Sequence, residues 1–417
     1  MPAARILEGE KPRRSKRELL LEAAAKAFNR SGVTQTSLAQ IGQDLGVTRA
    51  ALYYYAEDRD DLLFQCYRQA CETQARDLER AVRSNGSSLD RVLAYVRYGF
   101  DSERAEVAAL CEVALLPDEK RETIEGLRQA NLARLMALIE EGVSAHEIRP
   151  CKPLVVAEAI AGMLAWGPIA PRWSDSAASP DLARLSAGAC ELLADGVAAD
   201  PSRAHEPIVV DLERLRAPAP APFDRQAMAA QKTEEVLRTA SRLFNERGVD
   251  ATSLDDIAAA LGATKGAVLH YFDDKPALVA RCYARAFDLA EGVFEISRSH
   301  NGDGLARSLI GYRGLVEINA RAGFEPLAPF VGLDALRPDD RAEVRRRITH
   351  LENIYPDDAT RGVADGSIRD IDLQAVAVAS AGAFGWLPKW MAGQRKHDAT
   401  AIAGELQTLF VAGLRAR

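Results

Sequence analysis

Apolar residues recur at every third or fourth position along most of this chain, which is the period of an amphipathic helix. Between Arg17 and Ser31 they fall on one helical face, as the positions of Leu20, Leu21, Ala24, Ala27 and Phe28 show. Few segments alternate between apolar and polar residues as a half-buried strand does. The pattern therefore predicts an all-α protein.

The helical pattern occurs twice. Residues 16–67 align without a gap on residues 232–283, and about two in five aligned residues are identical. The likeness continues more weakly downstream, where Trp166 and Pro168 correspond to Trp386 and Pro388. We therefore expect a duplicated unit of roughly two hundred residues.

Each copy contains signals for two short helices joined by a tight turn. In the first copy Gly32 is expected to end a helix, Ser37 to cap a second one over 38–45, and Thr48 to cap a third that runs to about Tyr54. Gly46 lies in the turn between the second and third helices. This arrangement, repeated in the second copy, predicts a helix-turn-helix.

Further helices are predicted beyond each helix-turn-helix. In the first half they cover 89–100, 103–115, 118–145, 154–165 and 181–198. In the second half they cover 305–320, 339–364, 373–391 and 399–414. Pro356 interrupts the 339–364 pattern where the first half has Met136, so either this helix alone is kinked or the proline is a tolerated irregularity.

Five regions follow from these patterns. They are an arm with the first helix-turn-helix (1–62), a first helical domain (63–199), a Pro/Ala-rich linker (200–224), a second helix-turn-helix (225–278) and a second helical domain (279–417). Alternating proline and alanine at 217–222 favours an extended, semi-rigid linker. The apolar run 208–210 is expected to dock on a domain.

Composition restricts the class of function. With 417 residues, 47% hydrophobic and 27% charged, the chain can bury a core in each half, and its net charge of -7 argues against unspecific coating of DNA. Its six cysteines and six histidines form no metal-ligand spacing, which predicts no metal or other cofactor and suggests free thiols in a reducing cytoplasm.

The N-terminus lacks an apolar leader, and the apolar stretch 153–171 contains Glu158 and is too short to span a membrane with ease. No nucleophile elbow, phosphate loop or dinucleotide fingerprint points to an enzyme.

The motifs of the two copies resemble the N-terminal signature of the TetR family of repressors. In the second copy the signature includes Thr252-Ser253-Leu254, Leu261-Gly262, Thr264-Lys265-Gly266 and His270-Tyr271-Phe272. The resemblance implies two all-α halves, each with three DNA-binding helices followed by a larger region for effector binding and dimerisation. The third helix would enter the major groove of an operator in double-stranded DNA.

The resemblance also implies which residues contact DNA. In the first copy they are Thr36, Thr48, Arg49, Ala50, Tyr53, Tyr54 and Arg59. In the second copy they are Thr252, Thr264, Lys265, Gly266, Leu269, His270 and Lys275. Hydroxyls and cationic groups of this kind hold phosphates, although Thr48 and Thr264 can also act only as helix caps.

The two copies differ in charge. A basic run at 11–17, which includes Arg13 and Arg14, precedes the first helix and is either a phosphate or minor-groove contact or a solvated tail. The second copy has no such run and carries Asp255 and Asp256 beside its second helix. We therefore expect the first copy to attract DNA more strongly.

The last two helices of each half are rich in alanine and resemble the family's dimerisation pair. This resemblance implies that the halves pair within one chain as a pseudo-dimer. The alternative is a homodimer of whole chains with four heads, where a head is one helix-turn-helix region (1–62 or 225–278). A small-molecule effector is implied as well, with Met163, Trp166, Phe384, Trp386 and Met391 as candidate lining residues or as ordinary core. The predicted function is a repressor released by that effector, and the alternative is an interaction module in which one or both heads no longer bind DNA.

Overall fold

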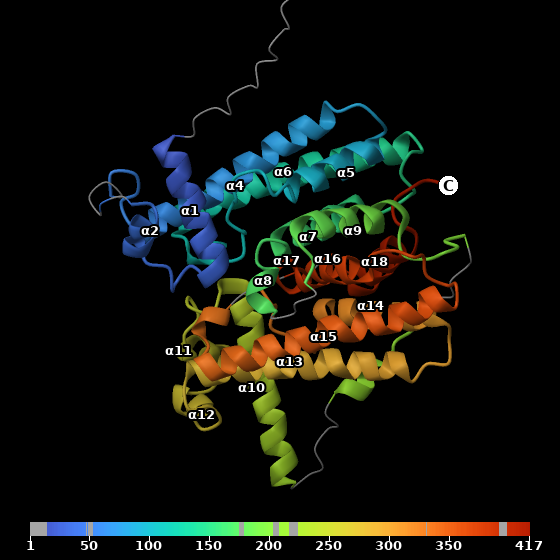
Figure 1. Cartoon of the computed structure of the whole chain (residues 1–417). Coiled ribbons are helices and arrows are strands. Elements are labelled where there is room, and N and C mark those ends of the chain that lie inside the picture. Colours follow the sequence, from blue (N-terminus) through green and yellow to red (C-terminus); the bar gives the residue numbers. More distant parts are fainter. Residues whose placement is uncertain are drawn as a thin grey trace, which may run out of the picture.

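The computed structural model describes residues 15–46, 48, 53–174, 179–202, 208–216, 224–330, 332–391 and 398–417. Within these ranges the secondary structure is helical, with two isolated β-bridges and no strand (Figure 1). The prediction of an all-α fold is confirmed. None of the described helices is both long and apolar enough to cross a membrane.

The order of helices repeats from one half to the other. The first half contains α1 (Lys16–Ser31), α2 (Leu38–Asp44), α4 (Arg59–Val82), α5 (Ser88–Gly99), η1 (Val113–Leu115), α6 (Asp118–Ser144), α7 (Pro153–Trp166), α8 (Ala170–Trp173) and α9 (Leu182–Asp195). The second half, preceded by η2 (Leu212–Leu215), contains α10 (Arg225–Arg247), α11 (Leu254–Ala260), α12 (Lys265–Leu269), α13 (Lys275–Arg298), α14 (Gly304–Ala320), η3 (Leu333–Ala335), α15 (Pro338–Ala364), α16 (Leu373–Gly385), α17 (Leu387–Trp390) and α18 (Ala399–Ala412).

The helix ends follow the sequence signals. Ser15 and Glu18 form a capping box at the start of α1, and Gly32 ends this helix with a φ of 81°. Ser37 caps α2 as predicted, because its hydroxyl oxygen accepts the amide of Ala39 at 3.2 Å. These caps satisfy backbone groups that a helix cannot pair internally.

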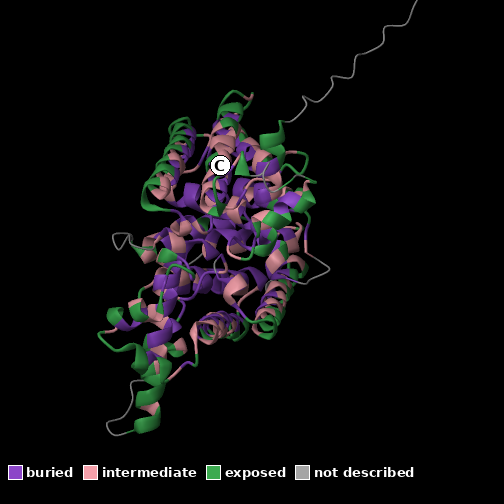
Figure 2. Ribbon diagram, turned by 90° about the vertical axis from the view of Figure 1, so that its left-hand side faces the viewer, coloured by how far each residue is buried: buried purple, intermediate pink, exposed green. Residues whose placement is uncertain are grey.

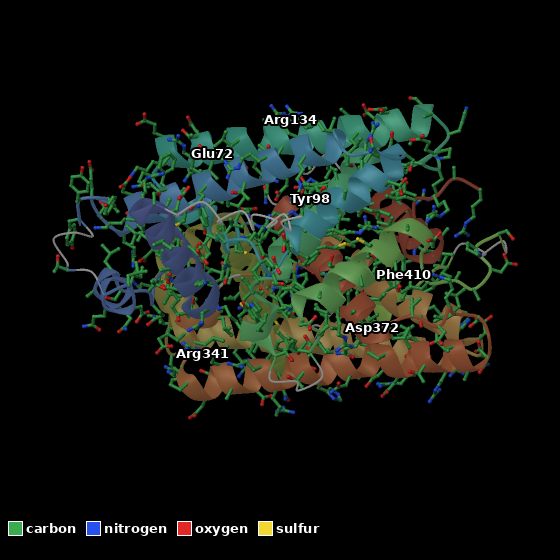
Figure 3. All side chains as sticks on the ribbon, turned by 45° about the horizontal axis from the view of Figure 1, so that its top comes forward. Glu72, Tyr98, Arg134, Arg341, Asp372 and Phe410 are labelled. Atoms are coloured by element: carbon green, nitrogen blue, oxygen red, sulfur yellow. The ribbon has the colours of Figure 1, made fainter. Side chains whose placement is uncertain are left out.

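The two halves lie one above the other, with α7, α9, α16 and α18 between them (Figure 1). The crossing of α7 and α16 depends on two glycines, since a Cβ atom at Gly382 would lie 2.8 Å from the carbonyl oxygen of Gly162. Buried residues fill this central layer (Figure 2). Polar side chains such as Glu72 and Arg134 cover the outer layer that α4 and α6 form (Figure 3). The core of the first helical domain is therefore continuous with that of the second half, whereas buried residues of the first helix-turn-helix region, such as Phe28 and Leu62, form a separate cluster.

Backbone hydrogen bonds join the halves in a reciprocal way. The amide of Arg149 donates to the carbonyl of Leu414 at 2.8 Å, and the amide of Arg369 donates to the carbonyl of Val197 at 2.9 Å. Their guanidinium groups also correspond, because each donates to the carbonyl of a glycine in the opposite half. The duplication thus reproduces one contact twice, as a two-fold axis would.

The structure corrects two predicted helices. Residues 103–112 form a loop rather than a helix, because their backbone is tied to α1 and α4: Ala109 donates to Asn29, and Glu112 donates its amide to Tyr67. The segment 373–391 is not one helix either, since α16 ends at Gly385 and α17 starts anew with Pro388 in its first turn. The helix α15, by contrast, continues through Pro356.

Part of the linker packs on the second half. In the run 208–210, which is predicted to dock, Val210 is buried and Ile208 packs against the core, whereas Val209 is 89% exposed. Leu212, just beyond this run, is buried as well. The guanidinium of Arg216 lies 4.8 Å from the centre of the Phe324 ring. The predicted extended Pro/Ala stretch at 217–222 lies outside the described residues.

Candidate DNA-reading heads and ligand cavity

The second head contains a complete helix-turn-helix. Its helices α11 and α12 are joined through Gly262, whose φ of 63° a glycine adopts without strain. Ser253 and Thr264 cap the two helices, each with a side-chain oxygen that accepts the backbone amide three residues further on. Ile257 and Val268 are buried beneath them. These contacts hold α12 across α11 with its other face outward.

The outward face of α12 carries the residues expected to contact DNA. Lys265, Gly266, Leu269 and His270 are all exposed. The ammonium of Lys265 lies 3.0 Å from a carboxylate oxygen of Asp255, and both side chains are more than half exposed. Exposed pairs of this kind contribute little stability, so a phosphate group can compete for the lysine.

The described part of the first head exposes two aromatic residues. Tyr53 is 42% exposed and Tyr54 is 83% exposed, which are high values for large side chains. Thr48 is exposed as well. Four other candidates of this head lie outside the described residues: Arg13, Arg14, Arg49 and Ala50.

Arg59 and Lys275 occupy equivalent positions at the start of the long helix that follows each head. Each donates to a backbone carbonyl of the loop before the second helix of its head, Arg59 to Thr34 and Lys275 to Asp250, both at 3.4 Å. Burial lowers the pKa of Lys275, and the carboxylates of Asp250 and Asp256 counteract part of that shift. The structure therefore places both cations beside the heads, in contact with the head's own backbone.

Thr36 and Thr252 are buried and have structural partners. The hydroxyl of Thr36 donates to the carbonyl of Gly32 at 2.6 Å, and that of Thr252 donates to the carbonyl of Gly248 at 2.8 Å. Both hydroxyls close the turn after the first helix of a head. This location corrects the expectation that the two threonines face DNA.

Two buried asparagines, which sequence reasoning missed, connect the heads to the helical domains. Asn29 donates to the carbonyl of Val107 and accepts the amide of Ala109, both at 2.9 Å. Asn245 makes the same pair of bonds with the loop 326–328. The signal was present in the repeat, where these asparagines align. Each head is thus held to a loop of the helical domain that follows it.

The second half encloses an apolar cavity of about 160 Å³. Its walls come from α13, α14, α15 and α16, and Trp166 of the first half completes them. The side chains of Tyr283, Phe287, Tyr312 and Phe384 line it with aromatic rings. A compact molecule without charge is the natural occupant of such a space.

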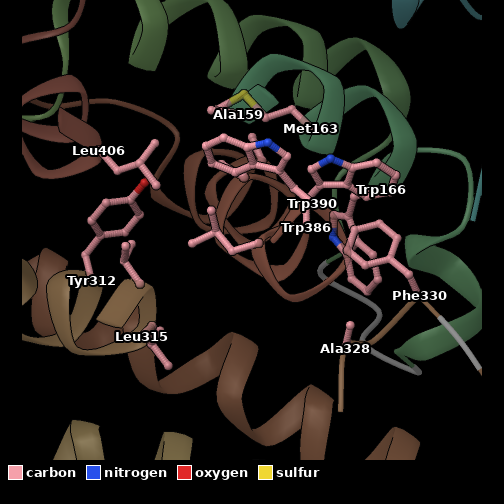
Figure 4. Packing of buried hydrophobic residues seen from close by; sticks show 14 of the residues in the cluster. Ala159, Met163, Trp166, Tyr312, Leu315, Ala328, Phe330, Trp386, Trp390 and Leu406 are labelled. Atoms are coloured by element: carbon pink, nitrogen blue, oxygen red, sulfur yellow. The ribbon is translucent and has the colours of Figure 1, made fainter. Parts of the chain in front are cut away.

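The five predicted lining residues divide between two cavities and the core. Trp166 and Phe384 line the cavity of the second half, whereas Trp386 lines a smaller one of about 60 Å³ in the first half. Both indoles contact the ring of Phe330, with centroids 5.4 and 5.5 Å apart (Figure 4). Met163 is buried, and Met391 packs against the core.

The first half holds charges where the second half is apolar. A carboxylate oxygen of Glu158 lies 3.5 Å from the guanidinium of Arg128, and the other accepts the indole N–H of Trp386 at 3.0 Å. Burial raises the pKa of Glu158, while Arg128 and Trp386 lower it. Among the described residues no cluster of three or more histidine, cysteine, aspartate or glutamate side chains could hold a metal ion.

Comparison with known proteins identifies four segments of the chain. Residues 20–66 and 236–282 match the bacterial regulatory proteins of the tetR family. Residues 90–176 and 319–414 match the tetracyclin repressor-like C-terminal domain. Both matches occur twice and in the same order.

Similarity to individual proteins is more distant. The HTH-type transcriptional regulator AcrR of Shigella flexneri is 39% identical over 75 residues, which cover 18% of this chain and only 30% of AcrR. The HTH-type transcriptional repressor KstR2 of Rhodococcus jostii (strain RHA1) is 27% identical over 165 residues, or 37% of this chain and 77% of KstR2. Among solved structures, AibR in complex with isovaleryl coenzyme A and operator DNA is 21% identical, with a TM-score of 0.37, over 43% of this chain and 97% of AibR.

The four segment matches cover most of the chain and agree with the repeated order of helices. The chain belongs to the tetR family of bacterial regulatory proteins, with two tandem units on one polypeptide.

Proposed function

We propose that the chain is a sequence-specific, cytoplasmic transcriptional regulator whose two heads read the two halves of one operator. The observation that carries this proposal is the position of the heads: α1 and α2 lie at the same end of the molecule as α11 and α12 (Figure 1). One continuous DNA duplex can therefore meet both. Helix-turn-helix dimers present two recognition helices to DNA in the same way.

The packing between the halves supports an intrachain pseudo-dimer. α7 packs against α16, and α9 packs against α16 and α18, so each half covers the apolar helices of the other. The salt bridge between Arg149 and Glu405, at 2.9 Å and largely buried, joins the halves as well. A chain whose dimerisation helices are already paired needs no second chain to bury them. The regions 1–62 and 225–278 would then act as its two reading heads.

The proposed DNA-facing surface consists of exposed residues of the two heads. In the second head it includes Thr264, Lys265, Gly266, Leu269 and His270. In the first head it includes Thr48, Tyr53 and Tyr54, together with Arg13, Arg14, Arg49 and Ala50 from the family resemblance. Arg59 and Lys275 add positive charge beside the heads.

The regulatory part of the proposal is repression that a small molecule relieves. The cavity of the second half supports it, because it is apolar, enclosed by four helices of that half and completed by the first half. A ligand that binds one arrangement of the halves more tightly would shift the separation of the heads.

The test is selection of bound sequences from a random DNA library with the full chain, followed by titration of variants. We expect two unlike half-sites about one helical turn apart. Tyr54→Ala should relax the sequence preference in one half-site, and the double variant Lys265→Ala/His270→Ala should relax it in the other. Arg134→Ala, on the exposed outer face of α6, is the matched control and should change neither.

The possible outcomes separate the proposals. Enrichment of a perfect palindrome would contradict the intrachain pseudo-dimer and favour a homodimer of chains. No enrichment with both heads intact would contradict the regulator. It would favour an interaction module, in which the Asp255–Lys265 pair stays closed.

A further inference from the structure

Trp166 has an unusual position in the cavity of the second half. It is only 4% exposed, and its indole N–H has no hydrogen-bond partner among the described residues. A buried donor without a partner costs free energy, because it has lost its bonds to water. A ligand that supplies a hydrogen-bond acceptor to this donor would remove the cost and gain affinity from it.

The duplicated half shows what such an acceptor does. Trp386 corresponds to Trp166, and its indole N–H donates to Glu158 at 3.0 Å. The residue that corresponds to Glu158 is Val378, which lines the cavity and offers no acceptor. Within the described ranges the protein therefore supplies no acceptor for Trp166.

Four other polar side chains of the cavity lining already have partners, among them Tyr283, whose hydroxyl donates to the carbonyl of Ala328 at 3.3 Å. Asn319 donates to the carbonyl of Leu315 at 2.7 Å, and Ser380 donates to that of Ala377 at 2.9 Å. Glu352 accepts the hydroxyl of Ser174, a residue of the first half, at 2.5 Å. Trp166 is the one lining residue with an unpartnered buried donor in the described part of the chain.

The charge of the lining decides which acceptor is suitable. Ile348 stands where the first half has Arg128, and among the residues that the structure describes no lysine, arginine or histidine lines the cavity. Burial raises the pKa of Glu352, whose carboxyl would repel an anion when ionised. A carboxylate ligand would therefore lack the cation that stabilises Glu158 in the first half. A neutral acceptor carries no such cost.

We propose that the cavity takes one compact, neutral, lipophilic molecule with a single strong hydrogen-bond acceptor, a ketone or ester carbonyl, which accepts the indole N–H of Trp166. We expect no second site of this kind in the first half, because Arg128 lines its cavity of only about 60 Å³ and Glu158 already accepts the indole N–H of Trp386. The volume of about 160 Å³ is close to that of an engineered apolar cavity of about 150 Å³ that binds benzene. This inference rests on the proposed effector function and specifies its ligand.

Two probes of equal shape test the carbonyl. Propiophenone and propylbenzene differ only in a carbonyl that replaces a methylene group, and calorimetric titration of the full chain, without DNA, measures both. We expect propiophenone to bind at one site per chain and about tenfold more tightly than propylbenzene. Trp166→Phe should remove this preference and leave the affinity for propylbenzene unchanged. Trp386→Phe is the matched control and should leave the preference intact.

Four results would overturn the proposal: no binding of propiophenone, equal affinity for the two probes in the unaltered chain, an unchanged preference in Trp166→Phe, or two sites per chain. Hydrocinnamate, the anionic probe, should bind more weakly than either neutral one, and tight binding of it would also contradict the neutral ligand. Because these titrations contain no DNA, they remain informative if selection finds no operator. Conversely, a confirmed operator with no binding of propiophenone would leave the proposed function standing and remove this inference alone.

Discussion

The ion pair of Arg128 and the buried Glu158 allows a prediction whose control is built into the chain. At the equivalent positions the second half has Ile348 and Val378, both buried and apolar. The double variant Arg128→Ile/Glu158→Val therefore copies a packing solution that the same fold already uses. We expect it to fold with almost the stability of the unaltered chain, although each single change is costly.

The magnitudes follow from what each change leaves behind. Arg128→Ile leaves the carboxyl of Glu158, which is 2% exposed, with only the indole N–H of Trp386, and should cost about 4 kcal/mol. Glu158→Val should cost about 2 kcal/mol, because Arg128 is 19% exposed and keeps its pair with Glu125 at 2.9 Å. The double variant leaves only the indole without an acceptor, which costs about 1 kcal/mol.

Urea unfolding followed by circular dichroism, with one common slope for the four proteins, measures this cycle. A loss of about 6 kcal/mol in the double variant, as additivity requires, would refute the reasoning, because it would mean that the two charges do not depend on each other. The double variant has a second readout. It leaves the Trp386 N–H beside an apolar space, so the number of propiophenone sites per chain should rise from one toward two.

Two further predictions concern the crossing of the halves and a buried carboxyl. A Cβ atom at Gly162 would meet the backbone of Gly382 across the crossing, so Gly162→Ala should lower the melting temperature, whereas Gly126→Ala, with open space around it, should raise it slightly by favouring the helix. Burial raises the pKa of Glu112 from 4.5 to about 7, and the charge of Asp334 adds to this rise. Between pH 4.5 and about 7 the folded state therefore keeps a proton that the unfolded state loses. The free energy of unfolding should fall as pH rises through this range, by about 1–2 kcal/mol because the side chain is partly exposed. Urea unfolding at several pH values should show this slope in the unaltered chain and not in Glu112→Gln.

The repeat made most of the fold predictable, because a segment that occurs twice gives two readings of the same helix. Gly32 and Gly248 end the first helix of each head, and Thr264 caps α12, as their positions before and after apolar runs predicted. The prediction of a helix over 103–115 was wrong at residues 103–112. Its composition favours a helix, but hydrogen bonds to Asn29 and Tyr67 outweigh a local preference that is worth only tenths of a kcal/mol per residue.

The candidate site was less accessible from the sequence, since side-chain direction is a tertiary property. The family resemblance implied that Thr36 and Thr252 contact DNA, but a threonine hydroxyl can face DNA or bond to the preceding turn. The sequence also contained an unused signal. Extending the alignment places Arg128 against Ile348 and Glu158 against Val378, which indicates that the two helical domains differ in charge at these positions.

Fusion of the two units into one chain gives a physical reason for this pattern of likeness and difference. In a homodimer every substitution appears twice, so a charge placed in one cavity is also placed in the other. In a tandem chain the halves can change separately. The contacts that remain reciprocal here are those that hold the halves and heads together, such as the pairs Gly162/Gly382 and Asn29/Asn245. The residues that differ surround the cavities, where one half has an ion pair and the other an open donor at Trp166. A ligand in the second half would therefore pull on α7 of the first half through Trp166, and both heads would respond to a single bound molecule.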